Sequence, residues 1–336
     1  MTRTLINSAI ATVVFVSASF GPVTAIAPET FYERTVSHIG MVVRDVDKTA
    51  QVVADVFDLE MPPIRKTQPV PFAAGYSGDQ QAYTRVADMR FNNIVLEITQ
   101  PVGGASPWRD HLEQYGEGIH HLGFAVSNVE DTARLLESKG GTRTLGREHG
   151  DYALVDLMSY LGIVVELTRA EGDLMSGGPT SVGPPDPHGL KAIGRIGLIV
   201  GNADRLRENW MTLFDVPVNP TTEQSGLQFP DDYTGDPNAS IRDAYVPLDN
   251  IWVNMMQPIG GRSPWRDLMN RREGAHYINF FVDDANATDA YLTSKGGRRI
   301  LGNSSASYSY NDMHEIMGGL TVLLHGEPLA DPPSQR

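Results

Sequence analysis

Short apolar runs with a period of two alternate along this chain with segments that carry apolar residues at helical spacing. In residues 38–59, a short apolar run and an aspartate cap precede such a helical segment. Its apolar face consists of Ala50, Val53, Val56 and Phe57. A period of two predicts a strand, and a period near 3.6 predicts an amphipathic helix.

The same plan occurs three more times, in residues 120–141, 195–215 and 277–297. In the second copy, Asn128 is the predicted helix cap. Strand-like stretches of alternating residues follow each predicted helix. The pattern therefore predicts an α+β protein in which a strand, a helix and several further strands form a unit that is repeated four times.

Longer repeats group these four units into two related halves. The sequence QPVGGASPWRD at 100–110 returns as QPIGGRSPWRD at 257–267. Likewise, LESKGGTRTLG at 136–146 returns as LTSKGGRRILG at 292–302. Matches of this length in the same order indicate an internal duplication.

The duplication predicts two domains, at residues 34–170 and 190–327. Residues 171–189 lie between them and have the Gly- and Pro-rich composition of a linker. We therefore expect each half to build its own sheet and its own cavity.

Residues 1–27 have the pattern of a secretory leader. Arg3 supplies a positive start, an apolar stretch runs from Leu5 to Phe20, and the small residues around Ala25 resemble a cleavage site. Polar residues interrupt the apolar stretch, which disfavours the alternative of a membrane anchor. We expect a cleaved signal peptide, a periplasmic or secreted protein, and no membrane association after cleavage.

The composition narrows the range of partners. The formal net charge is −14 at pH 7, and no basic run compensates for it, which excludes nucleic acid. The sequence has no cysteine, so stability must come from the core, with help from any bound metal. We expect a small-molecule substrate, and the sequence leaves open whether the protein is a monomer or a homodimer.

In four predicted strands of the first domain, one metal-capable side chain lies on the face opposite the bulky apolar residues. These four are His38 in HIGMVV, Glu97 in IVLEITQ, His121 in HLGFAV and Glu166 in IVVELTR. Their small neighbours Gly40, Gly123 and Ala125 are expected to leave room for a ligand. Two imidazoles and two carboxylates suit one divalent first-row metal, without distinguishing Zn, Mn, Ni, Co and Fe.

The first domain resembles the vicinal oxygen chelate superfamily, which includes glyoxalase I, methylmalonyl-CoA epimerase and extradiol dioxygenases. The resemblance lies in residues 37–59, 96–126 and 162–168, and is closest to the epimerase and glyoxalase I branch. It implies two tandem domains, each of paired βαβββ modules whose sheet curves around a cavity. It also implies that the metal ligands are His38, Glu97, His121 and Glu166.

The resemblance further implies a reaction class. In this superfamily the metal holds two neighbouring oxygens of the substrate, and a glutamate is the general base of the proton-transferring members. We expect an isomerase, epimerase or lyase with an enolate-like intermediate and with Glu166, or alternatively Glu97, as the base. A non-haem iron extradiol-type dioxygenase is one alternative, disfavoured by Glu97 as a fourth ligand. A non-catalytic small-molecule binding protein is the other.

The second domain lacks this ligand set. Aligning the halves puts Arg195, Asn254, Tyr277 and Leu323 opposite the four candidate ligands. His120, in contrast, has a counterpart in His276, so we interpret His120 as a structural residue. We therefore expect metal binding in the first domain alone.

Four further residues of the first domain are weaker candidates, for contact with the substrate: Trp108, Arg109, Tyr83 and Arg85. Trp108 and Arg109 belong to the segment GGASPWRD, in which Ser106 is expected to cap a helix and Pro107 to lie in its first turn. That segment recurs in the second domain, which favours a structural role. Tyr83 also suits an ordinary sheet surface.

Overall fold

The computed structural model describes residues 30–67, 69, 71–170, 186–231, 233–302 and 307–326. The predicted leader and most of the predicted linker lie outside the described residues. Among the helices that are described, none is long and apolar enough to cross a membrane.

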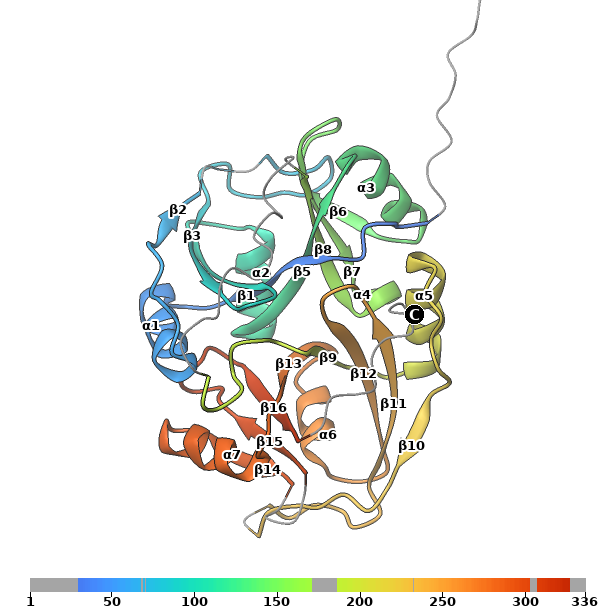
Figure 1. Cartoon of the computed structure of the whole chain (residues 1–336). Helices are drawn as coiled ribbons and strands as arrows, with labels where there is room; N and C mark the ends of the chain where they lie inside the picture. The colour runs from blue at the N-terminus through green and yellow to red at the C-terminus, as the bar shows by residue number, and fades with distance from the viewer. Residues whose placement is uncertain are drawn as a thin grey trace, which may run out of the picture.

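The first half of the described chain forms one eight-stranded sheet from two βαβββ modules (Figure 1). The first module consists of β1 (Val36–Val42), α1 (Val46–Phe57), β2 (Arg65–Lys66), β3 (Tyr83–Arg90) and β4 (Val95–Val102). After α2 (Pro107–Tyr115), the second module consists of β5 (Gly118–Val126), α3 (Val129–Ser138), β6 (Thr142–Leu145), β7 (Tyr152–Leu157), α4 (Met158–Leu161) and β8 (Ile163–Arg169). The strand order β2-β3-β4-β1-β5-β8-β7-β6 puts β1 and β5 at the centre, antiparallel to each other.

The second half repeats this arrangement. Its first module consists of β9 (Arg195–Ile199), α5 (Ala203–Phe214), β10 (Thr222–Gln224), β11 (Ser240–Pro247) and β12 (Trp252–Ile259). After α6 (Pro264–Met269) come β13 (Gly274–Phe281), α7 (Ala285–Ser294), β14 (Arg298–Leu301), β15 (Tyr308–Asp312) and β16 (Thr321–His325). The strand order β10-β11-β12-β9-β13-β16-β15-β14 is equivalent to that of the first sheet. The predicted fold class, α+β with tandem sheets of paired βαβββ modules, is confirmed.

The helices begin where the sequence provides a cap. Asp45 before α1 and Asn128 before α3 each accept a hydrogen bond from the backbone N–H three residues further on. Ser106 caps α2 in the same way, with Pro107 as the first helical residue, as predicted. Each cap satisfies an N–H group that has no partner inside the helix.

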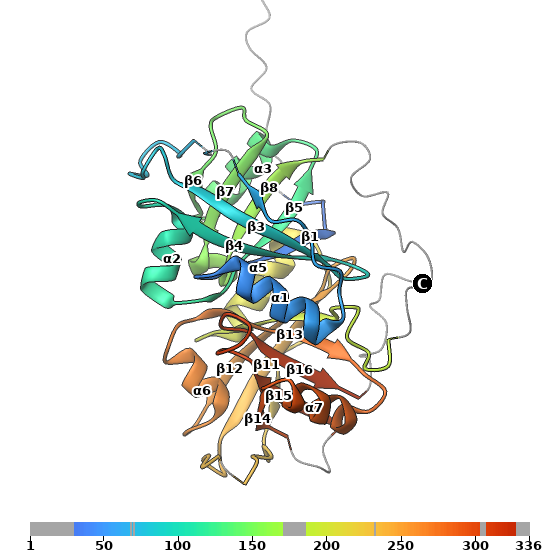
Figure 2. The same cartoon turned by 90° about the vertical axis from the view of Figure 1, so that its left-hand side faces the viewer.

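The two halves pack against each other through one shared hydrophobic core (Figure 2). Phe57 of α1 and Phe280 of β13 have ring centroids 5.2 Å apart. Trp210 of α5, which is fully buried, donates its indole N–H to the carbonyl of Leu161 at 2.9 Å. Burial of a side chain of this size contributes roughly 2–3 kcal/mol. The second half therefore supports the first through packing, whatever its own chemistry.

Candidate metal centre

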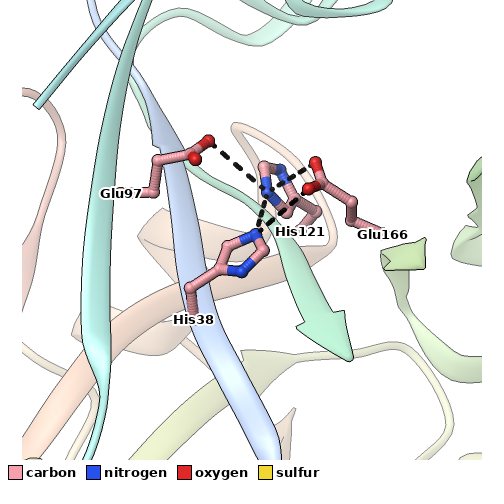
Figure 3. Close-up of side chains that lie close together, drawn as sticks. All are labelled: His38, Glu97, His121 and Glu166. Atoms are coloured by element: carbon pink, nitrogen blue, oxygen red, sulfur yellow. Dashed lines mark hydrogen bonds and ion pairs between the residues drawn. The ribbon is translucent and has the colours of Figure 1, made fainter. Parts of the chain in front are cut away.

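Four side chains from four adjacent strands meet at the centre of the first sheet (Figure 3). They are His38 on β1, Glu97 on β4, His121 on β5 and Glu166 on β8. Each offers one nitrogen or carboxylate oxygen, and these atoms all lie within 4.8 Å of one another. The structure thus brings together the four residues that alternation assigned to one face, and their role as metal ligands remains a prediction.

The distances suit one shared ion. The Nε2 atoms of His38 and His121 are 3.0 Å apart. Glu166 lies 3.5 Å from Nε2 of His38 through Oε1 and 3.4 Å from Nε2 of His121 through Oε2. Oε1 of Glu97 is 4.0 Å from Nε2 of His121. Donor atoms about 2.1 Å from one ion are roughly 3.0–3.4 Å apart at right or tetrahedral angles, so the set fits, with Glu97 as its loosest member.

Two glycines allow the imidazoles to meet. Gly40 on β1 pairs with His121 on β5, and Gly123 on β5 pairs with His38 on β1. A Cβ atom on Gly40 would lie 2.0 Å from the His121 ring, and one on Gly123 would lie 1.9 Å from the His38 ring. Both glycines therefore make room for the imidazole of the neighbouring strand. This corrects the expectation that they leave room for a ligand, whereas Ala125 does line the adjacent cavity.

The outer nitrogen of each imidazole has its own contact. Nδ1 of His38 lies 3.0 Å from Oγ of Ser37, and Nδ1 of His121 lies 3.1 Å from Nδ1 of His120. Contacts of this kind orient a ligand ring, and their loss typically lowers metal affinity by about 10- to 100-fold. The structure places His120 behind His121 and outside the four-residue cluster. Alternation separated the two histidines but did not reveal that they touch.

Burial changes the proton affinity of Glu166. This residue is 6% exposed, and the Tyr152 hydroxyl donates a hydrogen bond to its Oε2 at 2.9 Å. The pKa of Glu166 is raised to about 7, chiefly by burial and in addition by the charge of Glu97, while His38, the Tyr152 hydrogen bond and Arg65 act in the opposite direction. A carboxyl group with this pKa can both take up and release a proton at neutral pH.

Glu97 has both carboxylate oxygens engaged by other groups. Oε2 accepts a hydrogen bond from Nη2 of Arg65 at 3.1 Å, and Oε1 accepts one from Oγ1 of Thr99 at 3.0 Å. Arg65 also forms an ion pair with Asp88 at 3.1 Å. These contacts hold Glu97 at the edge of the cluster.

Sequence reasoning missed two residues of this site, Arg65 and Tyr152. Tyr152 lies on the same face of β7 as Leu154, which pairs with Glu166, so the alternation pattern contained a signal for it. Arg65 lies on a two-residue strand, which is too short to show any pattern.

The cluster borders a cavity of about 460 Å³. Its lining includes the hydroxyl-bearing residues Thr67 and Thr84 and the cations Arg65 and Arg169. Trp108 also lines it, and the buried indole N–H of this residue has no hydrogen-bond partner in the described part of the chain. A buried N–H without a partner is unfavourable, so the Trp108 N–H suits a ligand acceptor. The cavity therefore offers donors and positive charge beside the cluster.

The other predicted substrate contacts lie elsewhere. Tyr83 and Arg85 alternate with the residues of β3 that line the cavity, and Arg85 forms an ion pair with Asp47 at 2.6 Å. Neither residue lines this cavity, so the structure does not favour the substrate contact that was expected of them. Arg109 donates a hydrogen bond through Nη2 to the carbonyl of Pro101 at 2.9 Å, which ties α2 to β4, so it is a structural residue here.

The second half keeps the strands without the ligands. Register puts Arg195, Asn254, Tyr277 and Leu323 at the positions of the four candidate ligands, as the alignment predicted. The Tyr277 hydroxyl donates a hydrogen bond to Oδ1 of Asn254, so a neutral pair stands at two of the four positions. Within the described ranges of the second half, no group of three or more potential metal ligands converges.

Comparison with known proteins gives one family-model match, in the first half of the chain. Residues 37–153, from β1 to the start of β7, match the family model described as the Glyoxalase/Bleomycin resistance protein/Dioxygenase superfamily. None of the curated proteins matches the chain.

Among solved structures, the chain is similar to a mutant of 4-hydroxymandelate synthase from Streptomyces coelicolor. The TM-score is 0.59 at 12% identity, over 90% of this chain and 95% of that one. A halotolerant catechol dioxygenase is also similar, with a TM-score of 0.46 at 12% identity over 89% of each chain, too low to support an argument. The first likeness concerns the fold alone. Through this family-model match, residues 37–153 of the first half are similar to the glyoxalase/bleomycin resistance protein/dioxygenase superfamily.

Proposed function

We propose that this protein is a metal-dependent isomerase, epimerase or lyase that acts on a small molecule with adjacent oxygen atoms through an enolate-like intermediate. The observation that supports this proposal is the convergence of two imidazoles and two carboxylates beside a cavity of about 460 Å³. Members of the superfamily are typically metal-dependent enzymes, among them glyoxalases, epimerases and dioxygenases.

The metal would be one divalent ion held by His38, Glu97, His121 and Glu166. Imidazole nitrogens and carboxylate oxygens are ligands that Zn, Mn, Ni, Co and Fe all accept. Such an ion, when bound, supplies Lewis acidity that stabilises negative charge on two adjacent substrate oxygens. His120 holds the ring of His121 from behind and thereby keeps Nε2 directed at the common point.

Glu166 is the proposed general base. It takes a proton from the carbon next to the substrate carbonyl and returns that proton to a neighbouring atom, so the protein is unchanged at the end of the reaction. The Tyr152 hydroxyl donates to Oε2, so Oε1 is the oxygen that would handle the proton when Glu166 is off the metal. Glu97 is a poorer choice, because Arg65 and Thr99 engage both of its oxygens.

The cavity favours a hydroxy-carbonyl, sugar-derived or aromatic substrate. Its volume of about 460 Å³ is in the usual range for a small-molecule site. Trp108 offers an N–H donor without a partner, and Arg65 and Arg169 offer guanidinium N–H groups although each is already paired with a carboxylate, so substrate oxygens away from the reacting carbon have partners. An exported enzyme would not normally meet an acyl-CoA or abundant glutathione, which makes both poor candidates.

The number of ligands favours this reaction over oxygenation. Non-haem iron oxygenases typically hold iron with two histidines and one carboxylate and keep positions open for oxygen and substrate. Here a second carboxylate, Glu97, lies 4.0 Å from Nε2 of His121. The dioxygenase alternative therefore requires Glu97 to stay off the metal.

The test uses the full-length mature protein, treated with a chelator and reloaded with each of the five metals. We expect one bound ion per chain. We also expect metal-dependent exchange of substrate C–H hydrogen with D₂O, monitored by NMR for a panel of hydroxy-carbonyl, sugar-derived and aromatic compounds. The matched control is His121→Ala, with exchange lower by more than about 100-fold. Oxygen consumption by the iron-loaded protein without exchange would support the dioxygenase instead. Ligand binding without turnover under any metal would support a binding protein.

We further propose that the enzyme works outside the cytoplasm, on the basis of the leader pattern in residues 1–27. N-terminal sequencing of the protein from its native host is expected to begin near residue 26 or 28. Material from the periplasm or medium that still begins at Met1 or Thr2 would contradict cleavage.

A further inference from the structure

A second cavity lies in the second half, at the place that the metal-capable cluster occupies in the first. It measures about 80 Å³ and is lined by residues of β9, β11, β12, β15 and β16, among others. Arg195 on β9 pairs with Trp252 as His38 on β1 pairs with Val95, so a guanidinium stands at the strand position of a metal ligand. A fixed cation therefore replaces part of the site that holds metal-capable groups in the first half.

The Arg195 guanidinium is buried without a counter-ion. The residue is 2% exposed, its Nε and Nη2 have no hydrogen-bond partner, and no ion pair within the described residues neutralises it. Its guanidinium carbon lies 4.7 Å from the ring centre of Phe281 and 5.1 Å from that of Tyr245. Ring faces stabilise the charge in part, but they do not satisfy the N–H groups. Two N–H donors of a planar fork thus remain available to a ligand.

The same cavity presents one carboxylate. Asp243 is 1% exposed and accepts hydrogen bonds from Oγ1 of Thr222 at 2.6 Å and Nε2 of Gln224 at 2.9 Å. The Tyr245 hydroxyl also bonds to Asp243, so these three donors leave only part of the acceptor capacity of this carboxylate free. Asp243 and Arg195 both line the cavity yet form no ion pair with each other, so they lie more than 4.0 Å apart. A ligand between them meets a cation and an anion.

The remaining walls limit the ligand to a small one. Trp265 adds a buried indole N–H without a partner in the described chain, and Leu227 and Met256 are among the apolar lining residues. Since one water needs about 10–15 Å³ of a volume measured in this way, a cavity of this size admits a molecule of roughly five to eight non-hydrogen atoms.

We propose that this cavity binds a two- or three-carbon hydroxy acid or amino acid. The carboxylate of the ligand pairs with the Arg195 fork, because a planar guanidinium matches a carboxylate in two parallel hydrogen bonds. The neighbouring hydroxyl or ammonium group donates to Asp243, which removes the repulsion that a bare carboxylate would meet there. This site involves none of the four metal-capable residues, so it stands independently of the proposed enzymatic function.

The first test is calorimetric titration of the chelator-treated full-length protein with glycolate, glycine, acetate and ethylene glycol. Chelation removes metal from the first half, where glycolate could otherwise bind through its adjacent oxygens. We expect glycolate or glycine to bind with a Kd between about 10 µM and 10 mM, the range open to a ligand of so few non-hydrogen atoms. Acetate lacks the donor and ethylene glycol lacks the carboxylate, so each is expected to bind at least about tenfold more weakly. Whichever of glycolate and glycine binds more tightly identifies the donor group.

Variants then locate the site. Arg195→Met is expected to weaken binding by more than about 30-fold, and Arg195→Lys by less, because it keeps the charge but loses the fork. Asp243→Asn is expected to abolish the preference over acetate. Arg242→Met, on the same strand as Asp243 but paired with Asp204 at the surface, is the matched control and is expected to bind normally. Circular dichroism checks folding, and if Arg195→Met does not fold, the other two variants decide.

Two results would overturn the proposal. One is the absence of binding of both glycolate and glycine to the wild-type protein at concentrations up to about 50 mM. The other is equal binding of the better ligand by the wild-type protein and by folded Arg195→Met or Arg195→Lys. Loss of enzymatic activity in the first half affects neither result, so the two proposals fail separately.

Discussion

His121→Ala is expected to lose nearly all bound metal and, with it, the activity of the enzyme. The residue is fully buried, and its Nε2 lies within 4.0 Å of donor atoms from His38, Glu97 and Glu166. Loss of a residue that only supports a ligand lowers metal affinity by about 10- to 100-fold, so loss of the ligand itself should exceed about 100-fold. Metal content after dialysis against a weak chelator, measured by elemental analysis, checks this.

His120→Ala is the matched control, because it removes the neighbouring imidazole from the same strand. It is expected to bind metal about 10- to 100-fold more weakly and to recover most activity at saturating metal, since the four donors remain. His121→Ala should not recover. Arg195→His in the second half should recruit no metal, because its three partner positions carry Asn254, Tyr277 and Leu323. If His120→Ala stripped the metal while His121→Ala kept it, the assignment of the site would be wrong.

Glu166→Gln is expected to lower turnover by about 100- to 10,000-fold, because it removes the proposed base. Glu97→Gln is its control, because an amide oxygen still approaches the cluster. We expect Glu97→Gln to retain metal and at least about a tenth of the activity. Steady-state kinetics at saturating metal compares the two. A larger loss in Glu97→Gln would make Glu97 the base.

Glu166 should make the free energy of unfolding of the chelator-treated protein depend on pH. The pKa of Glu166 rises from 4.5 to about 7 on burial, so the folded chain favours the neutral form. The stability that Glu166 contributes is therefore present below pH 4.5 and lost as the pH rises through about 7, by up to roughly 3 kcal/mol. The difference in unfolding free energy between wild type and Glu166→Gln, measured by urea denaturation at several pH values, isolates this residue. A difference that does not change between pH 4.5 and 8 would contradict it.

Bound metal should reverse this trend. An ion requires the ionised carboxylate, so the apparent metal affinity is expected to rise with pH up to about 7 and then to level off for this residue. Titration of metal at several pH values should show that step in the wild type and not in Glu166→Gln.

Much of the fold was predictable because its signals are local. A period of two identifies a strand, a period near 3.6 identifies a helix, and caps such as Asn128 and Ser106 mark where helices begin. The duplication allowed the two halves of the chain to be aligned with each other. The alignment predicted that the second half lacks the four candidate ligands, and the strand register confirms which residues stand at their positions. The α+β class and the paired modules followed from these features.

The candidate site was predictable in part, for a related reason. Alternation decides which face of a strand a side chain occupies, so it separated His121 from His120. It does not decide which strands are neighbours or how they are aligned. Those depend on long-range pairing, which sets Gly40 beside His121 and Gly123 beside His38 and brings the rings together.

The remaining features exist only in the tertiary structure. Arg65 reaches Glu97 from a two-residue strand. Tyr152 reaches Glu166 from β7, the strand beside β8. His120 contacts its chain neighbour His121 through the Nδ1 atoms of the two rings. The unpaired state of Arg195 is likewise a property of its surroundings. The repeated elements and the faces of their residues could be predicted from the amino-acid sequence, because both follow from local periodicity. Contacts, burial and proton affinities were decided by tertiary packing, because they depend on groups far apart in the chain.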